Sequence, residues 1–276
     1  MDLAPSFTAN RPLVLVGAGK MGGALLAGWL GRSLRPDAVR VIDPSPPEDS
    51  ASLLAAAGLE AQAVPPMGAV ARVLVVAVKP QLIGGILPGL KLMVGDKTVV
   101  VSIAAGTTIA QLDAGLGPAA IVRTMPNTPA QVGRGITAAV ANAAVDDAGK
   151  ALVTRLLDAV GETVWLDDER LIDAVTAVSG SGPAYLFLLA ECLAEAGVAA
   201  GLPADVAAKL ARATVTGAGE LLYRSDLKPA QLRQNVTSPN GTTSAALAVL
   251  MGEGGLAPLM TKAVAAARKR SRELSG

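Results

Sequence analysis

The sequence predicts an α/β fold in which a Rossmann-type, doubly wound parallel sheet is followed by an all-helical domain. Up to about Trp165, short β-branched runs alternate with stretches of helical periodicity. The runs are apolar throughout, as in strands that are buried on both faces. Beyond that point Ala, Leu, Glu and Lys recur at helical spacing and the β-branched runs stop. We therefore expect two domains, residues 11–166 and residues 167–276.

Seven strands are expected in the first domain: Leu13–Val16, Val39–Asp43, Val73–Val78, Thr98–Ile103, Ala120–Arg123, Thr137–Val140 and Thr163–Leu166. Helices are expected between them over 21–30, 50–57 and 146–160, and in the second domain over 168–178, 183–200, 203–223, 229–235, 243–252 and 256–274. Three of the later helices start with proline, which suits a first helical turn because its missing N–H has no partner there.

Composition excludes several classes of function. The chain has 276 residues with no histidine, so Ser-His-Asp hydrolysis, Cys-His proteolysis and histidine-ligated zinc are excluded, and no metal site is expected. Its 24 Lys and Arg nearly balance 23 Asp and Glu, and aromatic residues are few, which argues against a nucleic-acid partner. The apolar stretches 174–190 and 235–252 are interrupted by Gly- and Pro-containing segments, so no membrane span is expected.

Cysteine usage and the N-terminal sequence bear on the compartment. Cys192 is the single cysteine and cannot form an internal disulfide, which favours a reducing environment. It lies in an apolar run and is expected to be a buried small hydrophobe rather than a nucleophile. The first residues lack the charged and apolar regions of a signal peptide. We therefore expect a cytoplasmic protein.

The motif Gly17-Ala18-Gly19-Lys20-Met21-Gly22 follows a strand and opens a helix. Gly17 permits the tight turn, Gly19 lets the backbone approach a pyrophosphate, and Gly22 lets the helix lie close to the strand. Asp43 ends the second strand, at the spacing where an acidic residue binds the ribose of a dinucleotide. This combination predicts a Rossmann dinucleotide-binding domain. The alternative is a tight strand-to-helix turn that binds no ligand.

Three further strands end in segments suited to a cofactor, because ligands bind at the carboxyl edge of open α/β sheets. Ala77-Val78-Lys79-Pro80 follows one strand, and Lys79 lies either near the cofactor's negative charge or in solvent. The small residues Ala104 and Ala105 follow the next, where a nicotinamide would approach the backbone. Asn127, between two prolines, is either a positioned amide or part of a rigid turn.

Two loops interrupt the helical half, at 179–183 and 237–243. Both carry hydroxyls and free amides ahead of helix N-termini, which favour carboxylates. The alternative is an ordinary helix–helix turn capped by Ser or Thr. Residues 171–223 are apolar on more than one helical face, so we expect the helical half to dimerise.

Six motifs, in the order of the family, resemble pyrroline-5-carboxylate reductase: 17–22, Ala-Val-Lys-Pro (77–80), Ser-Ile-Ala-Ala-Gly (102–106), Arg-Thr-Met-Pro-Asn-Thr-Pro (123–129), Val-Ser-Gly-Ser-Gly-Pro-Ala-Tyr (178–185) and Asn-Val-Thr-Ser-Pro-Asn-Gly-Thr-Thr (235–243). The resemblance runs from about Pro12 to Leu274. It implies an enzyme that reduces 1-pyrroline-5-carboxylate to L-proline, the last step of proline biosynthesis, with NADH or NADPH. It also implies self-association as a dimer or a larger ring of dimers.

The resemblance also implies roles for single residues. It places the phosphates on Ala18, Gly19, Lys20 and Met21, and the nicotinamide side near Ala77, Lys79, Ala104 and Asn127. It places the substrate at the loop comprising Ser238, Pro239, Asn240, Gly241, Thr242 and Thr243. Thr243 matches the family's substrate-facing threonine and is the expected catalytic residue, which orients the imine nitrogen.

The choice between NADH and NADPH stays open. Asp43 stands where relatives often carry small or hydroxylated residues, and its carboxylate would bind ribose hydroxyls and repel a 2′-phosphate, which favours NADH. The family's habit favours NADPH. Ser45 and three nearby arginines would help to hold the phosphate if Asp43 turned outward: Arg32, Arg35 and Arg40.

Two other functions compete with the imine reductase. A β-hydroxyacid dehydrogenase has a similar domain plan but needs a basic lysine in the helical domain. Lys209 is the only lysine well inside a helix there, and Ala213 stands at i+4 in place of an asparagine. The other is a dinucleotide-binding sensor or scaffold without turnover, which would not need the Gly-x-Thr loop at 241–243.

Overall fold

The computed structural model describes residue 3, residues 6–66 and residues 68–275. The chain forms two compact units. Unit 1 extends to Gly180 and includes the chain from Arg268 onward, and unit 2 is Ser181–Ala267. The sequence placed a domain boundary at 166/167, whereas the units divide further on. The helical turns after the last strand pack on the sheet through Ile172, which joins Ala138 and Val140 in one apolar cluster.

Unit 1 is built on an eight-stranded sheet with the order β3-β2-β1-β4-β5-β6-β7-β8. The strands are β1 (Leu13–Val16), β2 (Val39–Ile42), β3 (Ala61–Gln62), β4 (Val73–Val76), β5 (Val99–Ser102), β6 (Ala120–Met125), β7 (Gly135–Ala141) and β8 (Gly161–Trp165). The chain crosses from one half of the sheet to the other in the connection from β3 to β4, which places β4 beside β1, as in a doubly wound fold. The predicted fold class is confirmed.

Two strands, β7 and β8, run opposite to the other six and depart from the expected parallel arrangement. β7 runs antiparallel to β6, with Met125 opposite Ala138, while all other neighbours are parallel. The connection between them holds only a 3₁₀ turn, η5 (Thr128–Val132). A parallel pair needs a crossover of about a dozen residues or more, so this short connection forces the reversal.

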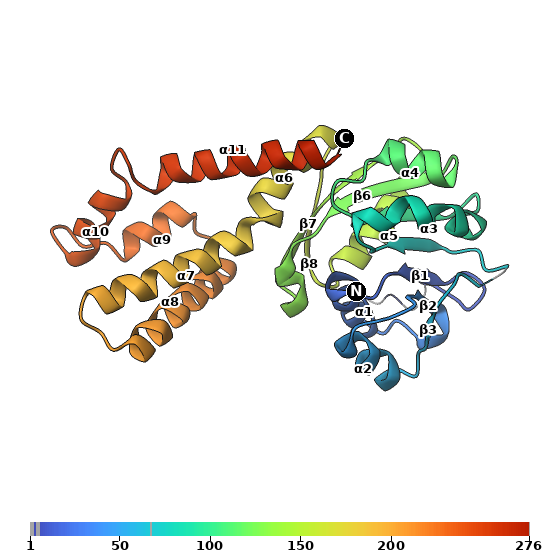
Figure 1. The fold of residues 1–276 in the computed structure, drawn as a ribbon, viewed down its shortest axis with the longest axis horizontal. Coiled ribbons are helices and arrows are strands. Elements are labelled where there is room, and N and C mark those ends of the chain that lie inside the picture. The colour runs from blue at the N-terminus through green and yellow to red at the C-terminus, as the bar shows by residue number, and fades with distance from the viewer. Residues whose placement is uncertain (1–2, 4–5, 67, 276) are drawn as a thin grey trace. The chain divides into compact units, whose positions relative to one another are not determined.

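Helices cover both faces of the sheet (Figure 1). On one face lie α1 (Lys20–Leu30), α2 (Glu48–Ala56) and α5 (Asp147–Leu157), and on the other α3 (Ile83–Leu90) and α4 (Ile109–Leu116). Each face has its own buried apolar cluster, so alternate residues of β1 pack in opposite directions: Leu13 and Leu15 toward one, Val14 and Val16 toward the other. Trp29 is fully buried on the first face, and its indole N–H donates to the Leu156 carbonyl across 2.9 Å.

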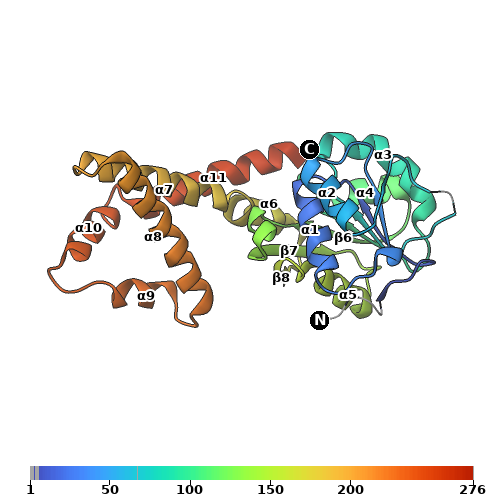
Figure 2. The ribbon, with the colours of Figure 1, turned by 90° about the horizontal axis from the view of Figure 1, so that it is seen from below.

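Short turns complete unit 1: η2 (Pro36–Ala38), η3 (Pro80–Leu82), η4 (Lys91–Met93), η6 (Glu169–Leu171), α6 (Ile172–Val175) and a π-helical turn, Thr176–Gly180. Unit 2 holds α7 (Gly182–Ala199), α8 (Ala204–Arg224), α9 (Pro229–Asn235), α10 (Thr242–Leu250) and most of α11 (Leu256–Ser275). α7 and α8 lie side by side in both views (Figures 1 and 2). They pack closely at Gly197, where an added Cβ would lie 3.1 Å from the Ala207 side chain.

Unit 2 exposes much apolar surface. Among the described residues Leu186, Phe187, Leu188 and Leu189 are all at least 46% exposed along α7. Cys192 on the same helix is exposed, so the expectation that it is buried is wrong for the single chain. A run of apolar residues therefore did not guarantee burial in the single chain.

One helical run in the described part of the chain, Glu169–Ala199, is long and apolar enough to cross a membrane by length and composition alone. Its mean hydropathy reaches 1.3, and 6% of that window is buried. The sequence predicted an interruption at 179–183; the π-helical turn extends to Gly180 and α7 begins at Gly182, so the interruption is limited to Ser181. The run begins in unit 1, where Ile172 is buried against β7.

Candidate active site

The carboxyl ends of the parallel strands gather the predicted cofactor segments at one edge of unit 1. Backbone bonds continue the ladder into the loops: Gly17 N–H donates to Ile42 O at 2.8 Å, and Ala77 N–H donates to Val16 O at 2.7 Å. Ile103 N–H donates likewise to the Val76 carbonyl at 3.0 Å. The loops after β1, β2, β4 and β5 are therefore held in register with one another.

The glycine loop after β1 has the geometry that its three glycines imply. Gly17 has φ +91°, and an added Cβ would lie 2.8 Å from the Ala77 carbonyl oxygen. At Gly22 a Cβ would collide with the Gly17 carbonyl oxygen. At Gly19, by contrast, no atom lies within 4 Å of the Cβ position, so the backbone is open to a ligand.

The N-terminus of α1 is free to receive an anion. Gly19 is the N-cap, no side chain caps the helix, and its first turn contains no acidic residue. The first N–H groups of a helix have no intrahelical acceptor and lie at the positive end of its dipole. Together with the open side of Gly19, this start fits a pyrophosphate, which is the group that the glycine motif predicts there.

Asp43 lies directly beside this loop. One carboxylate oxygen accepts a hydrogen bond from Ala18 N–H at 2.7 Å, and the other accepts from Ser45 N–H at 2.9 Å. The Ala18 carbonyl in turn accepts from the Ser50 hydroxyl at 2.5 Å. Ala18 is fully buried, and its N–H is used by Asp43. The resemblance suggested that Ala18 holds a phosphate; the N–H groups that remain for this purpose are those of Gly19, Lys20 and Met21.

Sequence reasoning missed Ser50. It stands in the first turns of α2, where serine usually faces solvent, and yet it is only 5% exposed. An added Cβ at Gly23 would lie 2.5 Å from its hydroxyl oxygen. Gly23 leaves room for the Ser50 side chain, but the sequence does not show that these two residues face each other. Ser50 could therefore be recognised only once the fold was known.

The segment after β4 contributes a small residue and an exposed cation. Ala77 lies against the glycine loop: a Cβ added at Gly17 would meet its carbonyl oxygen, and one added at Gly22 would lie 3.4 Å from its Cβ. A larger side chain at position 77 would therefore press on the glycine loop. Lys79 is exposed and precedes Pro80, the first residue of η3. Val78 is half-buried and packs on the α3–α4 side of the sheet. Both interpretations of Lys79 are compatible with this position.

The segments after β5 and β6 are held by contacts with residues further along the chain. Ala104 is buried, and Ala105 is exposed. Gly106 has φ +75°, and an added Cβ would lie 3.1 Å from the Leu274 carbonyl oxygen, so the end of α11 packs against this loop. The Asn127 side-chain oxygen accepts from Ile136 N–H at 2.9 Å. The amide thus braces the β6–β7 connection, which leaves only its NH₂ group to contact a cofactor.

The predicted substrate loop lies in unit 2. Gly241 N–H donates to the Ser238 carbonyl at 3.1 Å, which closes a turn with Pro239 and Asn240 in the middle. Asn240 has φ +58°, as the third position of a type II turn requires. α10 starts directly afterward with Gly241 as N-cap and no side-chain cap. Thr242 is exposed and Thr243 is half-buried in its first turn.

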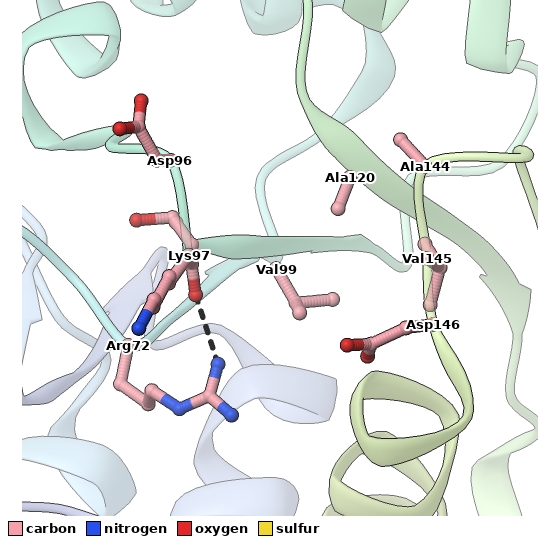
Figure 3. Close-up of a pocket in the computed structure, with 9 residues that line it drawn as sticks. Arg72, Asp96, Lys97, Val99, Ala120, Ala144, Val145 and Asp146 are labelled. Carbon is pink, nitrogen blue, oxygen red and sulfur yellow. Dashed lines mark hydrogen bonds between the residues drawn. The ribbon is translucent and has the colours of Figure 1, made fainter.

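A polar hollow at the opposite, amino edge of the sheet is not part of this constellation (Figure 3). The Arg72 guanidinium there donates to the Lys97 carbonyl at 2.8 Å. Asp146 caps α5 by accepting from Gly149 N–H at 2.7 Å. Arg72 and Asp146 therefore stabilise the strand and helix ends at which they lie.

Comparison with known proteins identifies the family of this chain. Residues 169–274 match the family model described as pyrroline-5-carboxylate reductase dimerisation, and residues 12–106 match one described as NADP oxidoreductase, coenzyme F420-dependent. A pyrroline-5-carboxylate reductase of Pseudomonas aeruginosa is 41% identical over 269 residues, which are 95% of this chain and 96% of that protein. The chain belongs to the pyrroline-5-carboxylate reductase family. The pea (Pisum sativum) reductase is 36% identical over 275 residues, covering 100% of both chains.

Solved structures of the family share the fold. The pyrroline-5-carboxylate reductase of Coxiella burnetii has a TM-score of 0.89 at 36% identity, covering 97% of this chain and 99% of that one. The Plasmodium falciparum pyrroline carboxylate reductase, crystallised with NADP bound, has a TM-score of 0.78 at 28% identity, covering 98% and 100%. The expected resemblance is confirmed, and the chain is an NAD(P)H-dependent oxidoreductase. The dimerisation model supports self-association through the helical half.

Proposed function

We propose that this chain reduces 1-pyrroline-5-carboxylate to L-proline with a hydride from a nicotinamide dinucleotide. The observation that carries the proposal is that one chain of this family contains two separate helix starts suited to anions. One is an uncapped helix start beside an open glycine in unit 1, and the other is the uncapped start of α10 behind the Ser238–Gly241 turn in unit 2. A dinucleotide sensor would need only the first.

The residues that hold the cofactor are those of the carboxyl edge. The N–H groups of Gly19, Lys20 and Met21 would bind the pyrophosphate, aided by the dipole of α1. Ala77, Ala104 and Ala105 keep the edge narrow and free of bulky side chains, so that the nicotinamide ring can approach the backbone. When bound, the nicotinamide supplies the hydride that reduces the imine carbon.

The substrate carboxylate fits the start of α10. The first N–H groups of this helix lack both an intrahelical acceptor and a side-chain cap. The preceding turn is rigid because Pro239 restricts it and Asn240 adopts the left-handed conformation that the turn requires. A carboxylate bound there gains the helix dipole and several hydrogen bonds without a basic side chain.

Thr243 is the residue that orients the reacting nitrogen. A threonine hydroxyl is too weak an acid to deliver a proton at neutral pH, so its role is to hydrogen-bond the imine nitrogen. The proton comes from water or from substrate that is already protonated. No histidine is needed, which fits a chain that has none. Most of the rate then comes from holding imine carbon and hydride donor in contact.

Lys209 argues against the hydroxyacid dehydrogenase. It is exposed on α8 in the single chain, and Ala213 stands at i+4 in place of an asparagine. The imine reductase needs no basic lysine and remains the function that the residues support.

We also infer that a second copy of the chain, rather than lipid, covers the exposed face of α7. The matched dimerisation model spans this region, and the apolar run itself carries Asp173, Glu191 and Glu195. Charged residues inside a lipid-facing helix are costly, whereas at an oligomer interface they can reach the rim. The single cysteine and the balanced charge support a cytoplasmic enzyme without a nucleic-acid partner.

A steady-state assay tests the proposal. Loss of absorbance by reduced nicotinamide should depend on added pyrroline-5-carboxylate and should yield proline in equal amount. A β-hydroxy acid with oxidised cofactor should give no turnover. Turnover of the hydroxy acid without turnover of the imine would favour the dehydrogenase, and cofactor binding without either reaction would favour the sensor.

A further inference from the structure

We propose that Asp43 makes this enzyme select NADH over NADPH. The inference rests on the proposed function, in which a dinucleotide lies along the carboxyl edge of the sheet. It concerns the adenosine ribose, whose 2′-position carries a hydroxyl in NADH and a phosphate in NADPH. The NADP that is bound in the Plasmodium relative shows that the family can hold the phosphate, so the selection must come from this chain's own residues.

The carboxylate of Asp43 is fixed in direction. Ala18 N–H and Ser45 N–H each donate to a different oxygen, at 2.7 and 2.9 Å. The side chain therefore turns in toward the glycine loop, where the dinucleotide passes, and not outward past Pro44. A carboxylate has about four acceptor positions, so two remain for ribose hydroxyls after these bonds are made. An acid at this position of the fold binds the 2′-hydroxyl.

The arginines that could have held a phosphate are used elsewhere. Arg40 donates from Nη1 to the carbonyls of Asp37 and Val39, at the amino end of β2. Arg35 pairs with Asp37 at 3.3 Å. The Arg32 guanidinium donates to the Asp158 carbonyl at 2.5 Å. The alternative in which these three side chains support a phosphate beside an outward-turned Asp43 therefore has no support from their contacts.

The surroundings of Asp43 are acidic. The sequence contains no lysine or arginine between Arg40 in β2 and Arg72, a segment that includes the end of β2, α2 and β3. Glu48 and Asp49 occupy the first turn of α2, and Glu60 lines the hollow next to Asp43. Lys79 follows β4, which is two strands from β2, or about 10 Å along the sheet. A 2′-phosphate at Asp43 would meet the negative charge of this carboxylate.

These observations together predict both an attraction and a repulsion. The ribose 2′-hydroxyl of NADH can donate to the free acceptor positions of Asp43. The 2′-phosphate of NADPH has no proton to donate there at neutral pH and is repelled by the carboxylate. Discrimination built from a favourable contact with one ligand and a like-charge clash with the other is stronger than either alone.

Binding titrations of NADH and NADPH to the intact enzyme test the inference, with reduced-nicotinamide fluorescence as the readout. The wild type should bind NADH at least about tenfold more tightly than NADPH, as expected for a like-charge clash. Asp43→Asn keeps the side-chain shape and removes the charge. It should lower the NADH:NADPH affinity ratio by about tenfold or more. Asp37→Asn, the same change at the amino end of β2, should leave the ratio within about twofold.

The NADH:NADPH affinity ratio is the decisive quantity. A loosened glycine loop would weaken the binding of both cofactors alike and would leave this ratio unchanged. A wild type that binds NADPH more tightly, or an Asp43→Asn ratio equal to that of wild type, overturns the inference and leaves the proposed function intact. Binding of neither dinucleotide overturns both. A ratio that falls in Asp43→Asn but not in Asp37→Asn supports the role of Asp43.

Discussion

The Ser271 hydroxyl donates to a carboxylate oxygen of Asp173 across 2.7 Å, although 98 positions separate the two residues. Ser271 lies in the last turns of α11 and Asp173 in α6, directly after the sheet. Unit 2 is the chain between these elements, Ser181–Ala267. The bond therefore joins the segment that leaves unit 1 to the segment that returns to it, and both ends of the helical half are anchored on the cofactor domain.

Ser271→Ala should lower the free energy of unfolding by about 1.5–3 kcal/mol, because it removes a part-buried hydrogen bond to a charged group. Thr261→Ala on the same helix is the control, since its hydroxyl bonds only the Ala257 carbonyl at an exposed site. Urea unfolding of both variants gives the comparison. Equal small changes would mean that the Asp173 bond does not anchor α11.

Gly19→Ala and Gly22→Ala should fail in different ways. A Cβ at Gly22 would collide with the Gly17 carbonyl, so this variant should be less stable and should lose cofactor binding together with its fold. A Cβ at Gly19 has open space, so that variant should keep its Tm and bind the dinucleotide more weakly. Thermal melts with and without NADH separate the two. Normal cofactor affinity in Gly19→Ala would exclude a pyrophosphate at this backbone.

Thr243→Val should reduce kcat/KM by about 10- to 150-fold, because a hydrogen bond to a charged or charge-developing group contributes about 1.5–3 kcal/mol. Valine is close in shape to threonine, so cofactor affinity and Tm should be unchanged. Thr242→Val, in the same helical turn, should have a smaller effect. Equal losses at both positions, or none at Thr243, would show that the imine nitrogen lies elsewhere.

Phe187→Glu should disrupt self-association. The side chain is 65% exposed on α7, and a buried carboxylate at an apolar interface is costly. Leu92→Glu is the matched control, because Leu92 is 79% exposed in η4, outside the helical half. Light scattering at micromolar concentration measures the mass of each. A Phe187→Glu protein of wild-type mass would place the interface away from this part of α7.

The parts of the fold that sequence reasoning found are those with local signals. β1, the glycine loop and Asp43 were predictable from one short segment. It contains an apolar run, a characteristic glycine spacing and an acidic residue at the expected distance. α9 was predicted at its observed bounds, since Pro229 marks its start. By contrast α3 was not named, because Gly84, Gly85 and Pro88 are poor helix formers, and it forms by burying Ile83, Leu87 and Leu90.

The remaining differences depend on contacts that are distant in sequence. The reversal of β7 follows from the length of one connection, which a strand pattern alone does not report. The contacts of Ser50 with Ala18 and of Gly106 with Leu274 join segments that only the folded chain brings together. Cys192 is exposed on α7 in the single chain, although the apolar run around it favoured burial. The candidate site residues were named from the sequence and stay predictions, whereas the direction of the Asp43 carboxylate required the structure.

The central claim, direct hydride transfer from the nicotinamide to the imine carbon, is tested most directly by isotope transfer. The enzyme is given pyrroline-5-carboxylate and NADH that is dideuterated at C4 of the nicotinamide, and the proline formed is examined by mass spectrometry and NMR. The account predicts one deuterium per proline, on the δ carbon next to the ring nitrogen. Unlabelled proline, or deuterium at any other carbon, would contradict it.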